Sequence, residues 1–133
     1  MLRDEPLGTA CLVTSATRGR RIAIEGAVLD GAGAPLTDAL VEIWQADADG
    51  RYPHAGDPQS AASDPAFGGY GRVATNADGR FRFQTIAPGR VTGPDGRLQA
   101  PHVLVALLAP GVLTRYWTRL YFDGEPSNAA DAV

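Results

Sequence analysis

The sequence contains no lysine and only one cysteine, Cys11, so its 12 basic residues are all arginines and no disulfide can form within the chain. A single cysteine is typical of a protein from a reducing compartment, and we therefore expect a cytoplasmic location. The net charge of −3 and the isoelectric point of about 5.2 argue against a nucleic-acid partner. The longest apolar run, residues 103–113, is interrupted by a Pro-Gly pair and is too short to span a membrane.

Short motifs that would indicate a metal centre or a nucleophile are also absent. The sequence has no His-x-His or Cys-x-x-Cys pair, the spacings that indicate a zinc site. Ser60 and Ser63 lack the glycine-flanked context of a nucleophile elbow, and nothing beside Cys11 in the sequence predicts an activated thiol. Asp47 and Asp49 fall in a turn, where aspartate commonly accepts hydrogen bonds from its own backbone. From these patterns alone we expect no catalytic residue.

What the sequence does contain is an ordinary globular composition and a series of short β-like segments. A length of 133 residues with 44% hydrophobic residues fits one domain with its own core. The clearest element is a hairpin, in which residues 72–75 and 80–86 are joined by an Asp-Gly turn. No segment has a convincing helical period. Further strands are expected at four places: residues 21–30, 40–46, 101–108 and 115–122.

The spacing of these strands favours an all-β fold, an antiparallel β-sandwich. We expect residues 20–124 to form this domain. Residues 1–19 show no sustained period and are expected to be a poorly ordered lead-in, and residues 125–133 are small and polar and are expected to form a fraying tail.

Alternation along the strands predicts the surroundings of several side chains. Val41, Ile43 and Gln45 should share one face of the strand at residues 40–46. His102 begins an apolar strand. We expect it to be a partly buried histidine that is hydrogen-bonded to a loop carbonyl, and we favour this interpretation over a role as a metal ligand. Aromatic residues in sandwich strands usually pack in the core, and we favour this over an interface role for three of them: Trp44, Tyr116 and Trp117.

The segment from Leu40 to Tyr52 closely resembles the signature of the intradiol ring-cleavage dioxygenases. The resemblance covers about residues 21–124, and the pairing of a Trp-Gln-Ala block with a later Pro-His block makes it specific. The fold of this family is a β-sandwich, in agreement with the strand pattern. Further matching blocks follow in the family's order: residues 64–67, 71–72, 78–81, 85–89, 100–102 and 118–122.

Catalytic members of this family hold a ferric ion with two tyrosines and two histidines. The resemblance places the two retained ligand positions at Tyr52 and His102, and the two lost ones at Val91 and Leu104. Valine and leucine have no donor atom, and an ion left partly unligated against apolar side chains is heavily penalised. The resemblance therefore implies no complete metal site and no cofactor bound by this chain.

Two neighbouring positions also differ from the catalytic pattern, because Gln99 stands where an arginine is expected and Arg119 where a glutamine is expected. With the two lost ligands, these changes resemble the iron-free α-type subunits of the protocatechuate-cleaving members. The resemblance implies a β-type partner chain that carries Fe(III). The complex would cleave a catechol acid with O2, between the hydroxyls, to a carboxy-muconate. Trp44, Tyr116 and Arg119 are then the candidates for a substrate cleft or subunit interface.

Departures from the α-type pattern leave two alternatives open. Residues 7–11 do not match the family's amino-terminal segment, the loop at residues 109–111 lacks an expected arginine, and family members continue beyond Phe122. The chain would then be a truncated, paralogous or degenerate α subunit, or a stand-alone, non-catalytic binding or scaffold sandwich. A rearranged metal site formed by three residues is the remaining hypothesis: Tyr52, His54 and His102.

Overall fold

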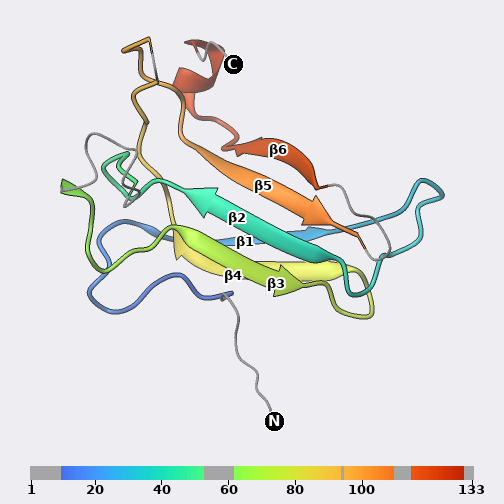
Figure 1. Cartoon of the computed structure of the whole chain (residues 1–133). Helices are drawn as coiled ribbons and strands as arrows, with labels where there is room; N and C mark the ends of the chain where they lie inside the picture. Colours follow the sequence, from blue (N-terminus) through green and yellow to red (C-terminus); the bar gives the residue numbers. More distant parts are fainter. Residues whose placement is uncertain (1–9, 53–61, 94, 110–114, 131–133) are drawn as a thin grey trace.

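The computed structural model describes residues 10–52, 62–93, 95–109 and 115–130, which form two antiparallel β-sheets (Figure 1). The prediction of an antiparallel β-sandwich is confirmed. The described elements are six strands and a short 3-10 helix: β1 Arg21–Ala27, β2 Leu40–Gln45, β3 Tyr70–Ala74, β4 Arg80–Ile86, β5 His102–Leu108, β6 Tyr116–Tyr121 and η2 Pro126–Ala130. No helix in these ranges has the length and hydropathy of a membrane span.

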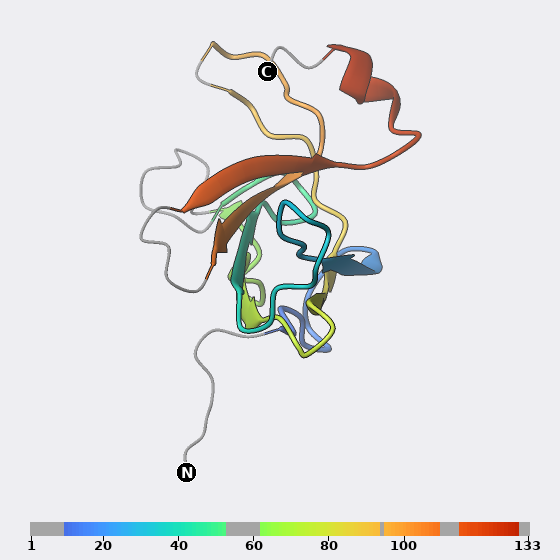
Figure 2. The same ribbon diagram turned by 90° about the vertical axis from the view of Figure 1, so that its right-hand side faces the viewer.

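The larger sheet has the strand order β3-β2-β5-β6, and the smaller one pairs β1 with β4. In Figure 1 the β1–β4 pair lies behind β2 and β3. Figure 2 shows the two layers side by side, with the β6 end of the larger sheet extending past the smaller one. The larger sheet therefore has one face toward the β1–β4 pair and one face away from it, and its β6 edge is the least covered.

The predicted hairpin is correct at its turn and wrong in its pairing. The N–H of Asn76 donates to the carbonyl of Arg80, and that of Gly79 donates back to Asn76, so the Asp-Gly turn is present. The two strands then separate, because β3 pairs with β2 and β4 pairs with β1. The turn is thus a corner at which the chain passes from one sheet to the other.

The core lies between the two sheets and confirms the predicted alternation in β2. Val41, Ile43 and Gln45 are fully buried on the face toward the β1–β4 pair. The amide of Gln45 spans the two layers: its Nε2 donates to the carbonyl of Ile86 at 2.9 Å, and its Oε1 accepts from the Thr85 hydroxyl at 2.7 Å. A buried amide satisfied in this way fixes β2 against β4.

Residues 10–19, in the segment expected to be a poorly ordered lead-in, pack against the smaller sheet and its loops. Leu12 is buried in the core, and its N–H donates to the carbonyl of Gln84, so this segment lines the free edge of β4. Farther along, the Thr17 hydroxyl donates to the carbonyl of Ala66. At the other end of the chain, residues 126–130 form η2 in the segment expected to fray, and Asn128 Nδ2 donates to the carbonyl of Phe122 at 2.8 Å. The limits of the domain itself stay a prediction.

Candidate functional site

A cavity of about 510 Å³ gathers the four positions to which the resemblance assigns ferric ligands. Tyr52, Val91, His102 and Leu104 all line it. Side chains alternate along a strand, so Leu104 points to the opposite side from its buried neighbour Val103. The cavity therefore lies on the face of the larger sheet that points away from the β1–β4 pair. Its remaining lining residues are Trp44, Thr92, Gly93, Gln99, Trp117 and Arg119.

The floor of the cavity is a row of three residues on adjacent strands. Trp44 of β2 is directly opposite Leu104 of β5, and Leu104 is directly opposite Arg119 of β6. Residues paired in this way have Cβ atoms about 5 Å apart, so their side chains lie next to one another. An indole, an aliphatic side chain and a guanidinium are consequently presented together on one surface.

His102 lines the cavity, and its surroundings are those expected from the sequence: it is buried and hydrogen-bonded to a loop carbonyl. It is only 5% exposed, and its Nδ1 lies 2.9 Å from the carbonyl oxygen of Ala100. A carbonyl accepts only, so Nδ1 carries the proton and donates, and in the neutral ring Nε2 is left with its lone pair. His102 therefore offers the cavity a hydrogen-bond acceptor.

The loop before Tyr52 is held by the Asp47 carboxylate. One carboxylate oxygen accepts from the N–H groups of Asp49 and Arg51, each at 2.9 Å, and the other accepts from the N–H of Asp64 at 2.7 Å. The prediction that Asp47 serves its own turn is confirmed, and the same carboxylate also anchors a segment farther along the chain.

A close backbone contact joins this turn to the loop that carries Val91. The N–H of Gly89 donates to the carbonyl of Asp47 at 2.9 Å. Gly50 has φ of +80°, and a Cβ built on it would overlap the carbonyl oxygen of Arg90. Only glycine fits both the backbone angle and the space. This contact brings Tyr52 and Val91 to the same cavity.

Arg119 and Gln99, the two further positions that depart from the catalytic pattern, meet at the rim. Arg119 Nη1 donates to Gln99 Oε1 over a long 3.5 Å. The loop carrying Gln99 is held by Arg90, which donates to the carbonyls of Gln99 and Leu98 at 3.2 and 3.1 Å. The lining residues include no carboxylate. The charge that the lining presents is therefore positive.

The expectation that three strand aromatics pack in the core is wrong for two of them. Tyr116 is 57% exposed and Trp117 is 52% exposed, because they begin β6, the edge strand that extends beyond the smaller sheet. Trp44 is half-buried, with its ring centroid 5.2 Å from that of Trp117 and 5.0 Å from that of Tyr70. Trp44, Trp117 and Arg119 line the cavity, whereas Tyr116 is outside it.

A buried carboxylate beside Trp44 was not recognised from the sequence. Glu42 is 4% exposed, and Tyr70 donates a hydrogen bond to its Oε2. Arg72 Nε lies 3.6 Å from the same oxygen, and Arg115 Nε lies 3.5 Å from Oε1. Burial, followed by the contact with Glu42, raises the pKa of the Tyr70 phenol. The signal available in the sequence was the position of Glu42, two residues before Trp44 on the same face of β2.

The donor set of the cavity does not fit a ferric ion. Of the four assigned positions, only Tyr52 and His102 carry a ligand atom, and Val91 and Leu104 present hydrocarbon. Among the described residues, no group of three or more His, Cys, Asp or Glu side chains is placed so that it could hold a metal ion. His54 lies outside them, so the structure does not test the hypothesis that it completes a rearranged site.

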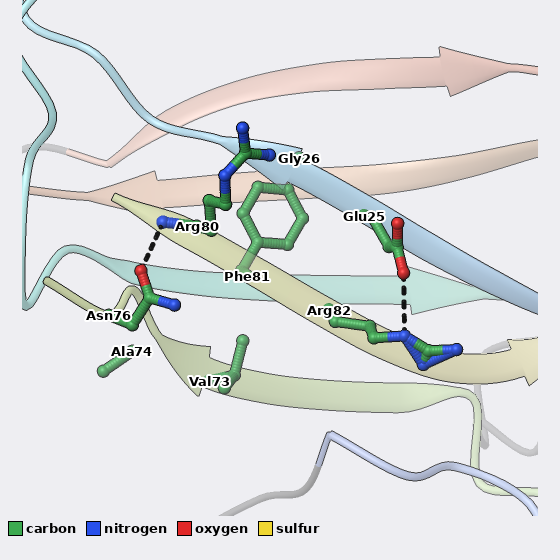
Figure 3. A pocket seen from close by; sticks show the side chains of 8 residues that line it. All are labelled: Glu25, Gly26, Val73, Ala74, Asn76, Arg80, Phe81 and Arg82. Atoms are coloured by element: carbon green, nitrogen blue, oxygen red, sulfur yellow. Dashed lines mark hydrogen bonds and ion pairs between the residues drawn. The ribbon is translucent and has the colours of Figure 1, made fainter. Parts of the chain in front are cut away.

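A second cavity, of about 410 Å³, opens beside the first residues of β4 (Figure 3). The ring of Phe81 lies against Gly26, where an added Cβ would approach its Cζ to 2.7 Å. The charged residues that line this cavity include an exposed ion pair, in which Arg82 Nε lies 2.8 Å from Glu25 Oε2. Exposed pairs of this kind contribute little, and this cavity contains none of the residues predicted for a site.

Comparisons with known proteins show which proteins the chain is similar to. The dioxygenase family profile matches residues 8–133. The protocatechuate 3,4-dioxygenase beta chain of Burkholderia cepacia is 43% identical over 117 residues, which cover 86% of this chain and 50% of that protein. The alpha chain from the same organism is 38% identical over 118 residues, 86% of this chain and 56% of that one. The chain thus spans about half the length of these curated relatives.

Solved structures give the same result for the fold. The dioxygenase domain of a dioxygenase carbohydrate-binding protein fusion from Streptomyces sp. SirexAA-E aligns with a TM-score of 0.76 and 35% identity, covering 98% of this chain and 75% of that one. The 3-chlorocatechol 1,2-dioxygenase of Rhodococcus opacus 1CP aligns with a TM-score of 0.76 and 26% identity, covering 91% and 51%.

Proposed function

Because the chain belongs to the intradiol dioxygenase family, we propose that it is an α-type, iron-free subunit of a protocatechuate 3,4-dioxygenase. The observation that supports this most is the cavity in which Tyr52 and His102 stand beside Val91 and Leu104. Overall identity does not separate the two subunit types, since the chain resembles a beta chain and an alpha chain to similar degrees. The loss of two donors is the feature that distinguishes an iron-free chain.

In this proposal the reaction takes place on a β-type partner that holds Fe(III). The complex would insert O2 into a catechol acid between its hydroxyls and release a carboxy-muconate. This chain would contribute assembly contacts and one wall of the substrate cleft. The single cysteine is consistent with a cytoplasmic complex.

The surface proposed to meet the partner is the β6 edge of the larger sheet. Tyr116 and Trp117 are both more than half exposed there, and Arg119 lies two residues beyond Trp117. Aromatic side chains and arginine are enriched in protein interfaces and supply most of the binding energy when they become buried. Covering these rings would also remove an exposed apolar patch.

Co-expression with the β-type chain of Burkholderia cepacia tests this proposal. We expect the two chains to co-elute in size exclusion, and the complex to consume O2 with protocatechuate faster than the β-type chain alone. Trp117→Ala should weaken co-elution, whereas Leu29→Ala, which removes a side chain of similar exposure from a loop, should not. Separate elution together with unchanged O2 uptake would refute an α-type role.

A stand-alone, non-catalytic binding or scaffold sandwich is the second candidate. The observation that favours it is the donor set of the cavity, in which only Tyr52 and His102 of the four assigned positions carry a ligand atom. A stable monomer that ignores the β-type chain would support this candidate over the first.

A further inference from the structure

We propose that Trp117, Trp44 and Tyr70 form a one-electron relay that removes oxidising equivalents from the cavity. An oxidised indole in the cavity takes an electron from Tyr70, and the phenol proton passes to Glu42. This inference goes beyond the proposed function, because it requires neither iron nor a partner chain. It gives a redox role to aromatic residues on the face of the larger sheet that points away from the β1–β4 pair.

The three rings form a continuous row across this face. The ring centroid of Trp44 lies 5.2 Å from that of Trp117 and 5.0 Å from that of Tyr70. Tyr70 is directly opposite Trp44 in the pairing of β3 with β2. Trp117 is opposite Ala106, whose small side chain allows the indole to reach across β5 toward Trp44. These separations are those of aromatic rings in contact, over which an electron moves directly from one ring to the next.

The positions of the rings give the relay a direction. Both tryptophans line the cavity, and Trp117 is more than half exposed, so a one-electron oxidant that enters the cavity meets an indole. Tyr70 is not among the residues that line the cavity. Tryptophan radicals oxidise tyrosine at neutral pH, so the electron moves from Tyr70 to Trp44. The radical thereby leaves the cavity.

The hydrogen bond from Tyr70 to Glu42 supplies the proton acceptor that this electron transfer requires. Burial, and then the contact with Glu42, raise the pKa of the phenol, so Tyr70 is protonated at neutral pH. Loss of an electron alone would leave a phenol radical cation, which is a strong acid. Glu42 Oε2 lies 2.8 Å from the phenol oxygen, with Arg72 and Arg115 beside the carboxylate. The proton therefore moves along an existing hydrogen bond.

The transfer step balances in atoms and in charge. The oxidised indole of Trp44, a radical cation, gains one electron and becomes neutral tryptophan. Tyr70 loses that electron and its phenolic proton and becomes a neutral tyrosyl radical, while the Glu42 carboxylate becomes a carboxylic acid. The initiating species is a small oxidising radical. A thiol or ascorbate in solution returns an electron to Tyr70, and Glu42 returns the proton.

Pulse radiolysis of the full chain in azide solution tests the relay, because the azidyl radical oxidises tryptophan faster than tyrosine at neutral pH. The tryptophan radical absorbs green light and the tyrosyl radical absorbs violet light. We expect the first band to decay as the second grows, at a rate independent of protein concentration. The rate should be lower in D2O, because a proton moves with the electron. A tryptophan band that decays without a tyrosyl band would count against the relay.

Matched variants identify the tyrosine and its proton acceptor. Tyr70→Phe should lose most of the tyrosyl band, whereas Tyr116→Phe, which removes a more exposed phenol next to Trp117 in the sequence, should retain it. Glu42→Gln should slow the conversion severalfold, because an amide is a poor proton acceptor. Circular dichroism of each variant verifies that the fold is retained. Equal tyrosyl bands in Tyr70→Phe and the parent chain would overturn the assignment of Tyr70.

A measurement on the parent chain covers the case in which a variant does not fold. A nitroso spin trap adds to tyrosyl radicals, and after brief radiolysis mass spectrometry should find more adduct at Tyr70 than at the more exposed Tyr116. Adduct at Tyr116 without adduct at Tyr70 would rule out the relay and leave assembly with a β-type chain untouched. Conversely, failure of co-elution with that chain would remove the proposed function and leave the relay standing.

Discussion

The Tyr70 hydroxyl donates a 2.8 Å hydrogen bond to Glu42 on the face of the larger sheet that bears the cavity. Glu42 has few other partners of comparable quality, since the Nε atoms of Arg72 and Arg115 lie 3.6 and 3.5 Å away. Burial of the phenol is the main cause of its raised pKa, and the neighbouring carboxylate adds to it. The pair thus links the stability of this face to the protonation of one tyrosine.

Replacing Tyr70 with Phe should lower the free energy of unfolding at neutral pH by about 1–3 kcal/mol, because a buried carboxylate loses a hydrogen bond. The unfolded phenol releases its proton near pH 10.0, before the folded one does. The contribution of Tyr70 is therefore complete below pH 10.0 and is lost as pH rises through the higher folded pKa. Urea unfolding of both proteins across this range should show their difference shrinking. A difference independent of pH would contradict the linkage.

Replacing Gln45 with Leu should destabilise the contact between the two sheets by about 1–3 kcal/mol. Leucine fills a similar volume but leaves the Thr85 hydroxyl and the Ile86 carbonyl without the partner they have now. The matched control is Gln84→Leu, one residue from Thr85 on the exposed face of β4, which should change stability by less than about 0.5 kcal/mol. Thermal and urea unfolding measure both variants, and equal losses would show that the buried amide contributes nothing special.

Replacing Gly50 with Ala should disturb the cavity as well as the stability. Gly33 has a similar φ, +87°, with nothing within 4 Å of an added Cβ, so Gly33→Ala measures backbone strain alone, about 1–2 kcal/mol. Gly50→Ala adds a clash with the Arg90 carbonyl and should cost more. Comparison of their unfolding free energies isolates the steric cost. Equal costs would mean that the loops separate freely.

Restoring the two lost donors should create a ferric site. Val91 and Leu104 are both partly exposed at the cavity, so Val91→Tyr combined with Leu104→His should be tolerated. Tyrosinate bound to Fe(III) absorbs visible light, and the double variant loaded with ferric ion should be coloured, with each single variant weaker. The parent chain should stay colourless. Colour in the parent chain would instead support a rearranged site that includes Tyr52, His54 and His102.

Local pattern predicted the strands well because each is a short β-like run, either alternating or continuously apolar, between turn residues. It also assigned the buried face of β2, since Val41 and Ile43 alternate with polar or bulky neighbours. It failed where pairing depends on distant segments. The turn before Arg80 has the sequence of a hairpin, but β4 buries Phe83 by pairing with β1, which a local motif does not reveal. Tyr116 and Trp117 were misplaced for the same reason, because their exposure depends on where the smaller sheet ends.

The site was predicted through resemblance more than through physical pattern. Tyr52, Val91 and His102 are far apart in the sequence, and no spacing rule would have grouped them at one cavity. The close contact between Gly50 and Arg90 brings Tyr52 and Val91 together, and the pairing of β5 with β2 places His102 beside them. The cluster at Glu42 was missed because its arginines come from elsewhere in the chain, and a carboxylate on the less covered face of a strand is ordinarily solvated.

The corner at Asn76–Gly79 has a consequence for how the chain folds. Because this corner sends β4 to the other sheet, β1 pairs with a strand from which it is separated in the sequence by β2 and β3. Likewise, β2 pairs with β5, and β3 and β4 lie between them in the sequence. Large loops must close before these contacts form, and such topologies fold on the order of milliseconds to seconds. The pair β5–β6 has a shorter connection between its strands than the pair β2–β3, so it is where we expect folding to begin.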